Sequence, residues 1–165
     1  MKKFLIIALM MAPLSVFAQK FAHFNLADIM PNMTEFKTAQ AELETLGKQY
    51  EDDVKRLQEE LQKKMEDYQK ATDLPENVRQ RREAELQDLY NRMQQVSADN
   101  SEQYQKASAE KMKVVQQLVN DAIKKIGEEG GYVYVVDTSS GSIPFINSAL
   151  STDITPELKK ALKIQ

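Results

Sequence analysis

The side chains that could carry acid–base or metal chemistry are one histidine and many carboxylates. His23 is the only histidine in the chain and there is no cysteine, so a nucleophile–base pair or a metal site is difficult to assemble. Most carboxylates fall on predicted solvated helix faces, whereas acid–base catalysis requires a desolvated pair. The glycines of 127–131 lie between a helix and a strand, the reverse of the order in a phosphate-binding loop. We therefore expect no enzymatic activity, no cofactor and no metal ion.

The first 18 residues have the pattern of a cleavable secretion signal. Lys2 and Lys3 precede an apolar run over 4–11, and Ala18 ends a sequence with the small residues of a cleavage site. No later apolar stretch approaches the roughly 20 residues that a membrane helix needs. Removal of the two lysines would change the net charge from −3 to −5. We expect an exported protein, and its negative charge disfavours a nucleic-acid partner.

Two long helices are predicted over 34–72 and 76–126, because the prolines of the remaining chain and every glycine except Gly47 lie outside them. In each helix apolar residues recur every three or four positions, although polar residues at 97–103 interrupt the second stripe. If the chain reverses near Pro75, residue i faces roughly residue 147 minus i and the two stripes meet. We predict an antiparallel helical hairpin over 34–126, with its tip near 72–78.

The two ends of the chain are predicted to form a small β-rich body over 19–33 and 127–165. Short strands are expected at 21–26, 132–136 and 143–146, followed by a helix with Thr155 as its N-cap. Three short strands cannot cover apolar side chains on both faces, so the body should bury them by self-association. A closed ring of strands from several protomers would also remove exposed strand edges. The residues that need cover are Phe24, Val133, Val135, Phe145 and Ile146.

Scattered methionines and a basic tip could contact a partner. Flexible thioether side chains suit surfaces that accept many sequences, although they equally fill gaps in a core. At the tip, an arginine cluster lies close to apolar residues in an otherwise acidic chain. It could meet an anionic membrane surface or an unfolded chain, while a solvated helix end is the plainer interpretation. The cluster consists of Arg79, Arg81 and Arg82, beside Leu74 and Val78.

The order of these elements resembles the Skp/OmpH family of periplasmic chaperones. The matching segments are FAHFNLADIM, FKTAQAELETL, LPENVRQRREAELQDL, GGYVYVVD and STDITPELKKAL, which together span essentially the whole chain after the signal. The resemblance implies a mainly α fold with a small β part, a jellyfish-like homotrimer in which an intersubunit β-barrel body carries three coiled-coil hairpins around a cavity.

In such a trimer, unfolded outer-membrane proteins would be held in the cavity without ATP, as by a holdase, and kept from aggregating. The resemblance assigns the body to Phe24, Val133, Val135, Phe145 and Ile146. It also implies that the hairpin residues able to meet a client include Met65, Tyr68, Leu74, Val78 and Met93.

The charge departs from the habit of this family, because its well-known members are basic and this chain is acidic. That difference puts electrostatic capture of clients, and any lipopolysaccharide site, in question. The alternative is a structural coiled-coil adaptor that bridges components of the cell envelope and binds no unfolded protein. An adaptor should have one fixed partner and a rigid seam, whereas the polar interruption at 97–103 and the scattered methionines favour the chaperone.

Overall fold

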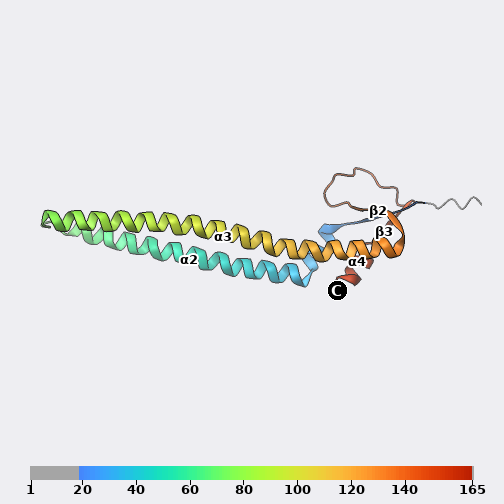
Figure 1. The fold of residues 1–165 in the computed structure, drawn as a ribbon, viewed down its shortest axis with the longest axis horizontal. Coiled ribbons are helices and arrows are strands. Elements are labelled where there is room, and N and C mark those ends of the chain that lie inside the picture. Colours follow the sequence, from blue (N-terminus) through green and yellow to red (C-terminus); the bar gives the residue numbers. More distant parts are fainter. Residues whose placement is uncertain (1–18, 165) are drawn as a thin grey trace, which may run out of the picture.

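The computed structural model describes residues 19–164, and the predicted signal over 1–18 lies outside them. Two long helices form an antiparallel hairpin that projects from a small body, as Figure 1 shows. The hairpin consists of α2 (Thr34–Lys70) and α3 (Glu76–Gly130). The body contains β1 (Lys20–Phe24), β2 (Tyr132–Asp137), β3 (Ser151–Asp153), α4 (Thr155–Ala161) and two 3-10 turns, Leu26–Asp28 and Met30–Asn32. The predicted mainly helical fold with a small β part is confirmed.

Helix α3 ends four residues later than predicted, at Gly130 rather than 126. The helix continues through Gly127, which therefore does not break it. It ends where Gly131 adopts the left-handed conformation (φ +65°) that favours glycine. The Gly131 N–H then donates to the carbonyls of Gly127 and Glu128, so the last turn of the helix is capped.

The two helices pair about one turn out of the predicted register. Tyr68 donates a hydrogen bond to Glu83, and Lys111 pairs with Glu42, so the numbers of facing residues add to 151 and 153 rather than 147. The prediction assumed a symmetric turn. The connection over 71–75 is instead extended at both of its ends, with ψ values of 93° and 145°, and it displaces α3 along the hairpin.

The polar residues at 97–103 do not interrupt helix α3, which is continuous there. The side-chain amide of Asn100 points across the hairpin and donates to the main-chain carbonyl of Tyr50 on α2, at 3.3 Å. Apolar packing resumes on either side of this crossing. The buried side chains along the seam are Ala39, Leu43, Leu57 and Leu89.

The sheet has the strand order β2-β1-β3, and both outer strands run parallel to β1. Parallel strands need a long crossover connection, and here the whole hairpin connects β1 to β2. The strand predicted at 143–146 is wrong: these residues lie in a loop over 138–150, and the third strand is Ser151–Asp153. Pro144 explains the difference, because proline lacks the N–H that a sheet ladder requires.

One face of the sheet is buried inside the protomer, which corrects the expectation that the body is too small to cover either face. Ala22 and Phe24 of β1 pack with Val115 and Val119 of α3, and with Leu158 of α4. All five side chains are at least nine-tenths buried. Phe24, expected at a subunit interface, therefore belongs to the protomer core, and Val135 packs against that core while partly buried.

The last helix begins at Thr155 itself, so this residue is not the N-cap that the sequence indicated. The Thr155 N–H is satisfied by the carboxylate of Asp153, at 2.9 Å. The Thr155 hydroxyl accepts a hydrogen bond from the backbone N–H of Asn25, at 3.2 Å, and so ties α4 to the end of β1. The predicted cap residue thus fastens the helix to the sheet instead.

Candidate interaction surfaces

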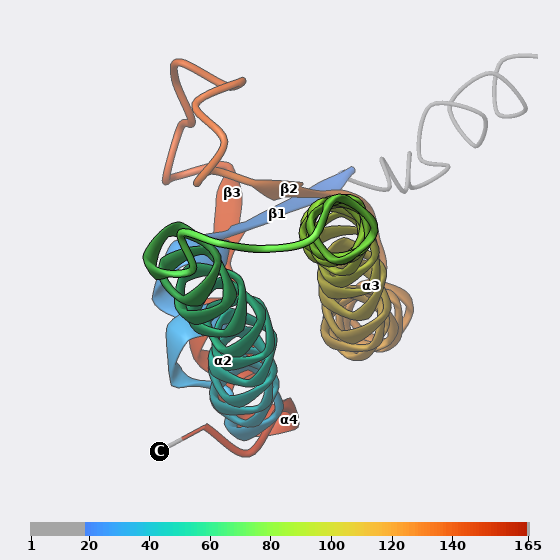
Figure 2. The ribbon, with the colours of Figure 1, turned by 90° about the vertical axis from the view of Figure 1, so that its left-hand side faces the viewer.

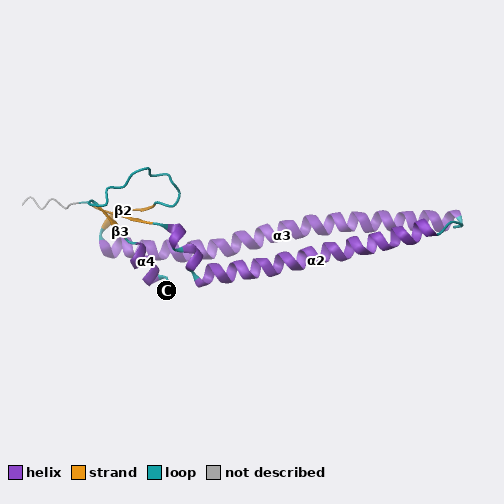
Figure 3. Ribbon diagram, turned by 180° about the vertical axis from the view of Figure 1, so that it is seen from behind, coloured by secondary structure: helices purple, strands orange, loops and turns teal. Residues whose placement is uncertain are grey.

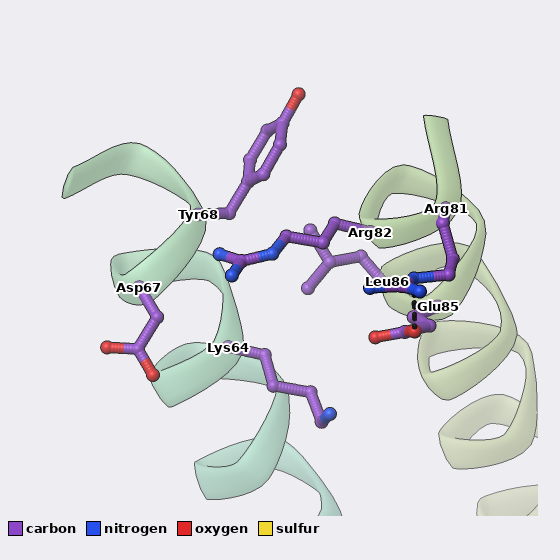
Figure 4. Close-up of a pocket in the computed structure, with 7 residues that line it drawn as sticks. All are labelled: Lys64, Asp67, Tyr68, Arg81, Arg82, Glu85 and Leu86. Atoms are coloured by element: carbon purple, nitrogen blue, oxygen red, sulfur yellow. Dashed lines mark ion pairs between the residues drawn. The ribbon is translucent and has the colours of Figure 1, made fainter. Parts of the chain in front are cut away.

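The tip of the hairpin carries a pocket of about 300 Å³ between the two helices, drawn in Figure 4. Three basic and two acidic side chains line it, together with one aromatic ring and one leucine. Helix α2 contributes Lys64, Asp67 and Tyr68, and helix α3 contributes Arg81, Arg82, Glu85 and Leu86. This tip pocket is therefore polar and mixed in charge, with basic groups in excess.

The predicted arginine cluster is largely neutralised by its own helix. Arg79 pairs with Glu76, and Arg81 lies 3.7 Å from Glu85. Arg82 extends toward α2, as Figure 4 shows, and has no ion pair within residues 19–164. The three arginines lie in the first turns of α3, and the carboxylate partners of Arg79 and Arg81 were not anticipated.

The Tyr68 ring is held across the tip by its hydroxyl, which donates a hydrogen bond to Glu83 on α3. This bond raises the pKa of Tyr68, because the neutral phenol is the donor and a nearby carboxylate disfavours the phenolate. Tyr68 is half-buried, as are Leu74, Val78 and Met93, whereas Met65 is 45% exposed. All five side chains predicted to meet a client thus reach the surface in the protomer.

Sequence reasoning missed several exposed apolar residues on α3. Val114 is 55% exposed and Leu118 is 37% exposed, although their neighbours Val115 and Val119 are buried in the body. The adjacent pairs Val114–Val115 and Leu118–Val119 could have revealed this exposure in the sequence. Successive helical residues point about 100° apart, so both members of a pair cannot face one core. Tyr90 and Tyr104 are also exposed.

A second opening lies halfway along the hairpin, and we call it the mid-hairpin groove. Its volume is about 350 Å³. The groove is mainly apolar, because two tyrosine rings and a valine enclose positions occupied by glycine and serine. It is lined by Gly47, Tyr50, Glu51 and Val54 of α2 and by Ser97, Asn100, Ser101 and Tyr104 of α3.

The face of the sheet that points away from α3 is only partly covered, and we call it the outer sheet face. Phe21 and Tyr134 stack on it, with ring centroids 6.3 Å apart and an angle of 9° between the planes. The 138–150 loop rises over this side of the sheet, as Figures 2 and 3 show. Beneath the loop is a cavity of about 250 Å³, to which Val136, Ile143 and Ile146 contribute.

Large apolar side chains remain exposed around the outer sheet face. Tyr134 is 66% exposed, Phe145 is 78% exposed and Leu150 is 72% exposed. Val133 is also exposed, while Ile146 is half-buried beneath the loop. Of the residues predicted for self-association, Val133 and Phe145 are therefore exposed in the protomer. Val133 is the extra residue where the pairing of β1 and β2 is irregular, whereas Tyr134 and Leu150, which were not predicted, lie at the outer sheet face.

Polar groups gather at the ends of β1 and β3. The His23 ring lies 2.8 Å from the Ser151 hydroxyl through Nδ1. Burial opposes ionisation of Asp153, but hydrogen bonds from Thr155, aided by nearby His23 and Lys159, outweigh it and lower the pKa of its carboxyl. These side chains bond to the body itself, and the His23 ring is held between β1 and β3 by its contact with Ser151.

Within residues 19–164, no three His, Cys, Asp or Glu side chains are grouped so that they could hold a metal ion. In the same part of the chain, no helix is both long and apolar enough to span a membrane.

Comparison with known proteins gives a family and a related fold. Residues 20–162 match the model of a family described as outer membrane protein (OmpH-like). A search of curated proteins gives no match. Among solved structures, a crystal structure from Caulobacter crescentus, described as a candidate outer membrane chaperone (OmpH-like), superposes with a TM-score of 0.75. The two sequences are 18% identical, and the match covers 87% of this chain and 83% of that one.

Proposed function

Because the chain belongs to the OmpH-like family, we propose that it is a periplasmic holdase chaperone that binds unfolded outer-membrane proteins and prevents their aggregation without ATP. The similar Caulobacter structure, described as an outer membrane chaperone candidate, supports a chaperone role. The expected periplasmic location rests on the family and on the secretion signal that residues 1–18 predict.

The observation that carries this proposal is the exposure of apolar side chains along a hairpin that stands away from the body. Met65, Tyr90 and Tyr104 are more than one-third exposed on the projecting part of the hairpin, and Val114 and Leu118 continue this exposure where α3 meets the body. Unfolded outer-membrane strands present alternating apolar residues, and weak contacts at many such points can keep them from aggregating while leaving them free to dissociate. The methionine adds a flexible contact that adapts to different sequences.

We propose further that the outer sheet face joins protomers into a homotrimer with a shared β-barrel body. Exposed Tyr134, Phe145 and Leu150 would be removed from water in that assembly, and Val133 would also be covered. Strands β2 and β3 form the two edges of the sheet, so each has a free side at which another protomer could pair. Phe24 would support this body from the protomer core rather than contact a neighbour.

Contact with a membrane would be peripheral, through the tip. Arg82 is the arginine there that lacks an ion pair within residues 19–164, and it lies beside the half-buried Leu86. One unpaired arginine gives weak attraction to anionic lipid. We therefore place membrane contact second to client binding.

The proposed function is tested by light scattering of the mature protein, alone and after a urea-unfolded outer-membrane barrel is diluted into it. We expect a trimer that gains the mass of a bound client while the solution stays clear. A constant mass beside an aggregating client would contradict the holdase. That result would favour the structural adaptor, which binds no unfolded chain.

A further inference from the structure

The mid-hairpin groove exists because small residues meet large ones across the seam. Gly47 has no side chain, and a Cβ at that position would lie 3.5 Å from the Tyr104 ring. On α3, Ser97 and Ser101 contribute only short side chains to the groove. The Asn100 side-chain amide donates a hydrogen bond to the Tyr50 carbonyl at 3.3 Å and so links the two sides of the groove. The polar residues that interrupt the α3 stripe therefore form one wall of a hollow, rather than a break in the helix.

The surroundings of the groove are acidic. Residues 42–56 and 99–111 contain eight acidic and five basic side chains, and three of the acidic residues are neutralised by ion pairs. Glu51 lines the groove itself and has no ion pair within residues 19–164. Four more carboxylates of these segments have no basic group within 4.0 Å in residues 19–164: Asp52, Asp99, Glu102 and Glu110. Two lysines of the same segments, Lys55 and Lys106, have no acidic group within that distance.

The tip pocket provides a contrast on the same hairpin. There the lining carries Lys64, Arg81 and Arg82 against two carboxylates. The linings of these two openings therefore differ in charge: the tip pocket has one basic group in excess, whereas Glu51 is the charged residue that lines the mainly apolar mid-hairpin groove.

The size of the groove sets the size of its occupant. The groove is a shallow opening with a volume of about 350 Å³, so it would hold an occupant against one side rather than enclose it. One aromatic side chain fits that space and could lie between the rings of Tyr50 and Tyr104, where aromatic pairs gain stability beyond their buried area. A lysine or arginine next to it could reach the Glu51 carboxylate.

We propose that the mid-hairpin groove binds an aromatic residue flanked by lysine or arginine in an unfolded client. This inference rests on the proposed function and specifies the client segment that one site accepts. Outer-membrane strands carry girdles of aromatic residues at both membrane interfaces, so such clients offer many candidate segments.

The test uses the absence of tryptophan from this chain, because a single tryptophan in a peptide then reports its own surroundings. Two soluble peptides are titrated with the mature protein, one with tryptophan between lysines and one with tryptophan between glutamates. We expect the lysine peptide to show a blue-shifted emission and raised anisotropy, and to bind more tightly than the glutamate peptide.

Three variants locate the binding. Ser101→Leu fills the groove and should weaken binding of the lysine peptide about tenfold, because the aromatic ring then clashes with the new side chain. Ala98→Leu adds the same side chain at an exposed position of α3 outside the groove and should leave binding unchanged. Glu51→Gln should weaken binding of the lysine peptide about two- to fivefold and leave the glutamate peptide unaffected or slightly tighter.

The outcomes separate the groove from the wider function. Equal affinities of the Ser101→Leu and Ala98→Leu proteins for the lysine peptide would overturn the groove as a site, even where the protein keeps an unfolded barrel in solution. Equal or tighter binding of the glutamate peptide would overturn the assigned chemistry of the client segment. Failure to keep the barrel soluble, with peptide binding intact, would instead contradict the holdase proposal alone.

Discussion

The side-chain amide of Asn100 on α3 bonds to the main-chain carbonyl of Tyr50 on α2, at 3.3 Å. A carbonyl oxygen has two lone pairs, so Tyr50 can accept this bond in addition to one from its own helix. The bond is partly buried, and it fixes one helix against the other where apolar contacts are sparse. It therefore helps to set both the register and the spacing of the hairpin.

Replacement of Asn100 by serine should weaken the hairpin. Serine has a similar helix propensity but cannot reach the Tyr50 carbonyl, so about 0.5–1.5 kcal/mol of unfolding free energy should be lost. Asn120→Ser makes the same change at an exposed position of α3 and serves as the control. Urea unfolding, followed by far-UV circular dichroism, gives the unfolding free energy of both variants. An equal loss of unfolding free energy in the two would contradict a role for the hydrogen bond between Asn100 and the Tyr50 carbonyl.

Two glycines near the end of α3 should respond to alanine in opposite directions. Gly131 has φ +65°, where a Cβ is strained, so Gly131→Ala should cost about 1–2 kcal/mol. Gly127 is helical, and a Cβ there would make an ordinary contact 3.5 Å from Val135, so Gly127→Ala should stabilise by about 0.5–1 kcal/mol. Thermal unfolding of the two variants provides the comparison, and shifts of the same sign would be inconsistent with this helix end.

The contribution of Asp153 to the body should depend on pH. The folded-state pKa of its carboxyl is lowered, so its stabilising effect is present above the ordinary value of 3.8 and is lost as the pH falls through the folded-state pKa. Asp153→Asn should therefore lower the urea midpoint at neutral pH and have little effect well below the ordinary value. A difference that stays constant down to strongly acidic pH would show that the charge is not responsible.

Self-association should depend on the outer sheet face. Phe145 is 78% exposed, so Phe145→Glu should leave the protomer folded but place a charge in the proposed interface. We expect the light-scattering mass to fall toward that of one chain, and the loss to be greatest at low concentration. Met65→Glu, an exposed change on the hairpin, is the control and should leave the mass unchanged. An unaltered oligomer in the Phe145→Glu protein would exclude this face.

The parts of the fold that follow from local pattern were predictable, and those that depend on distant pairing were not. The apolar periodicity, Pro75 and the glycines that follow residue 126 indicated two helices and their approximate ends, although α3 continues to Gly130. The register was wrong by about one turn, because the connection over 71–75 is extended and nothing in its sequence specified that geometry. The strand at Ser151–Asp153 is short and polar, and it forms only because β1 supplies its partner.

The interaction surfaces were predicted in part for the same reason. Apolar residues at the tip and in the body could be identified by type, but exposure depends on which face each element turns to the core. Phe24 and Phe145 illustrate this, since the first is 5% exposed and the second is 78% exposed. The mid-hairpin groove was visible in the sequence only as a polar interruption, because half of its lining, Gly47 included, comes from the other helix.

The central position of β1 in a parallel sheet constrains the order in which the chain can fold. Lys20 pairs with Tyr132 and Phe21 with Ser151, so β1 acquires its first partner strand only after the whole hairpin that connects it to β2. The hairpin needs only contacts between its own helices, and local contacts form fastest. The hairpin is therefore expected to form while β1 is still unpaired, and closure of the sheet becomes the last step of maturation.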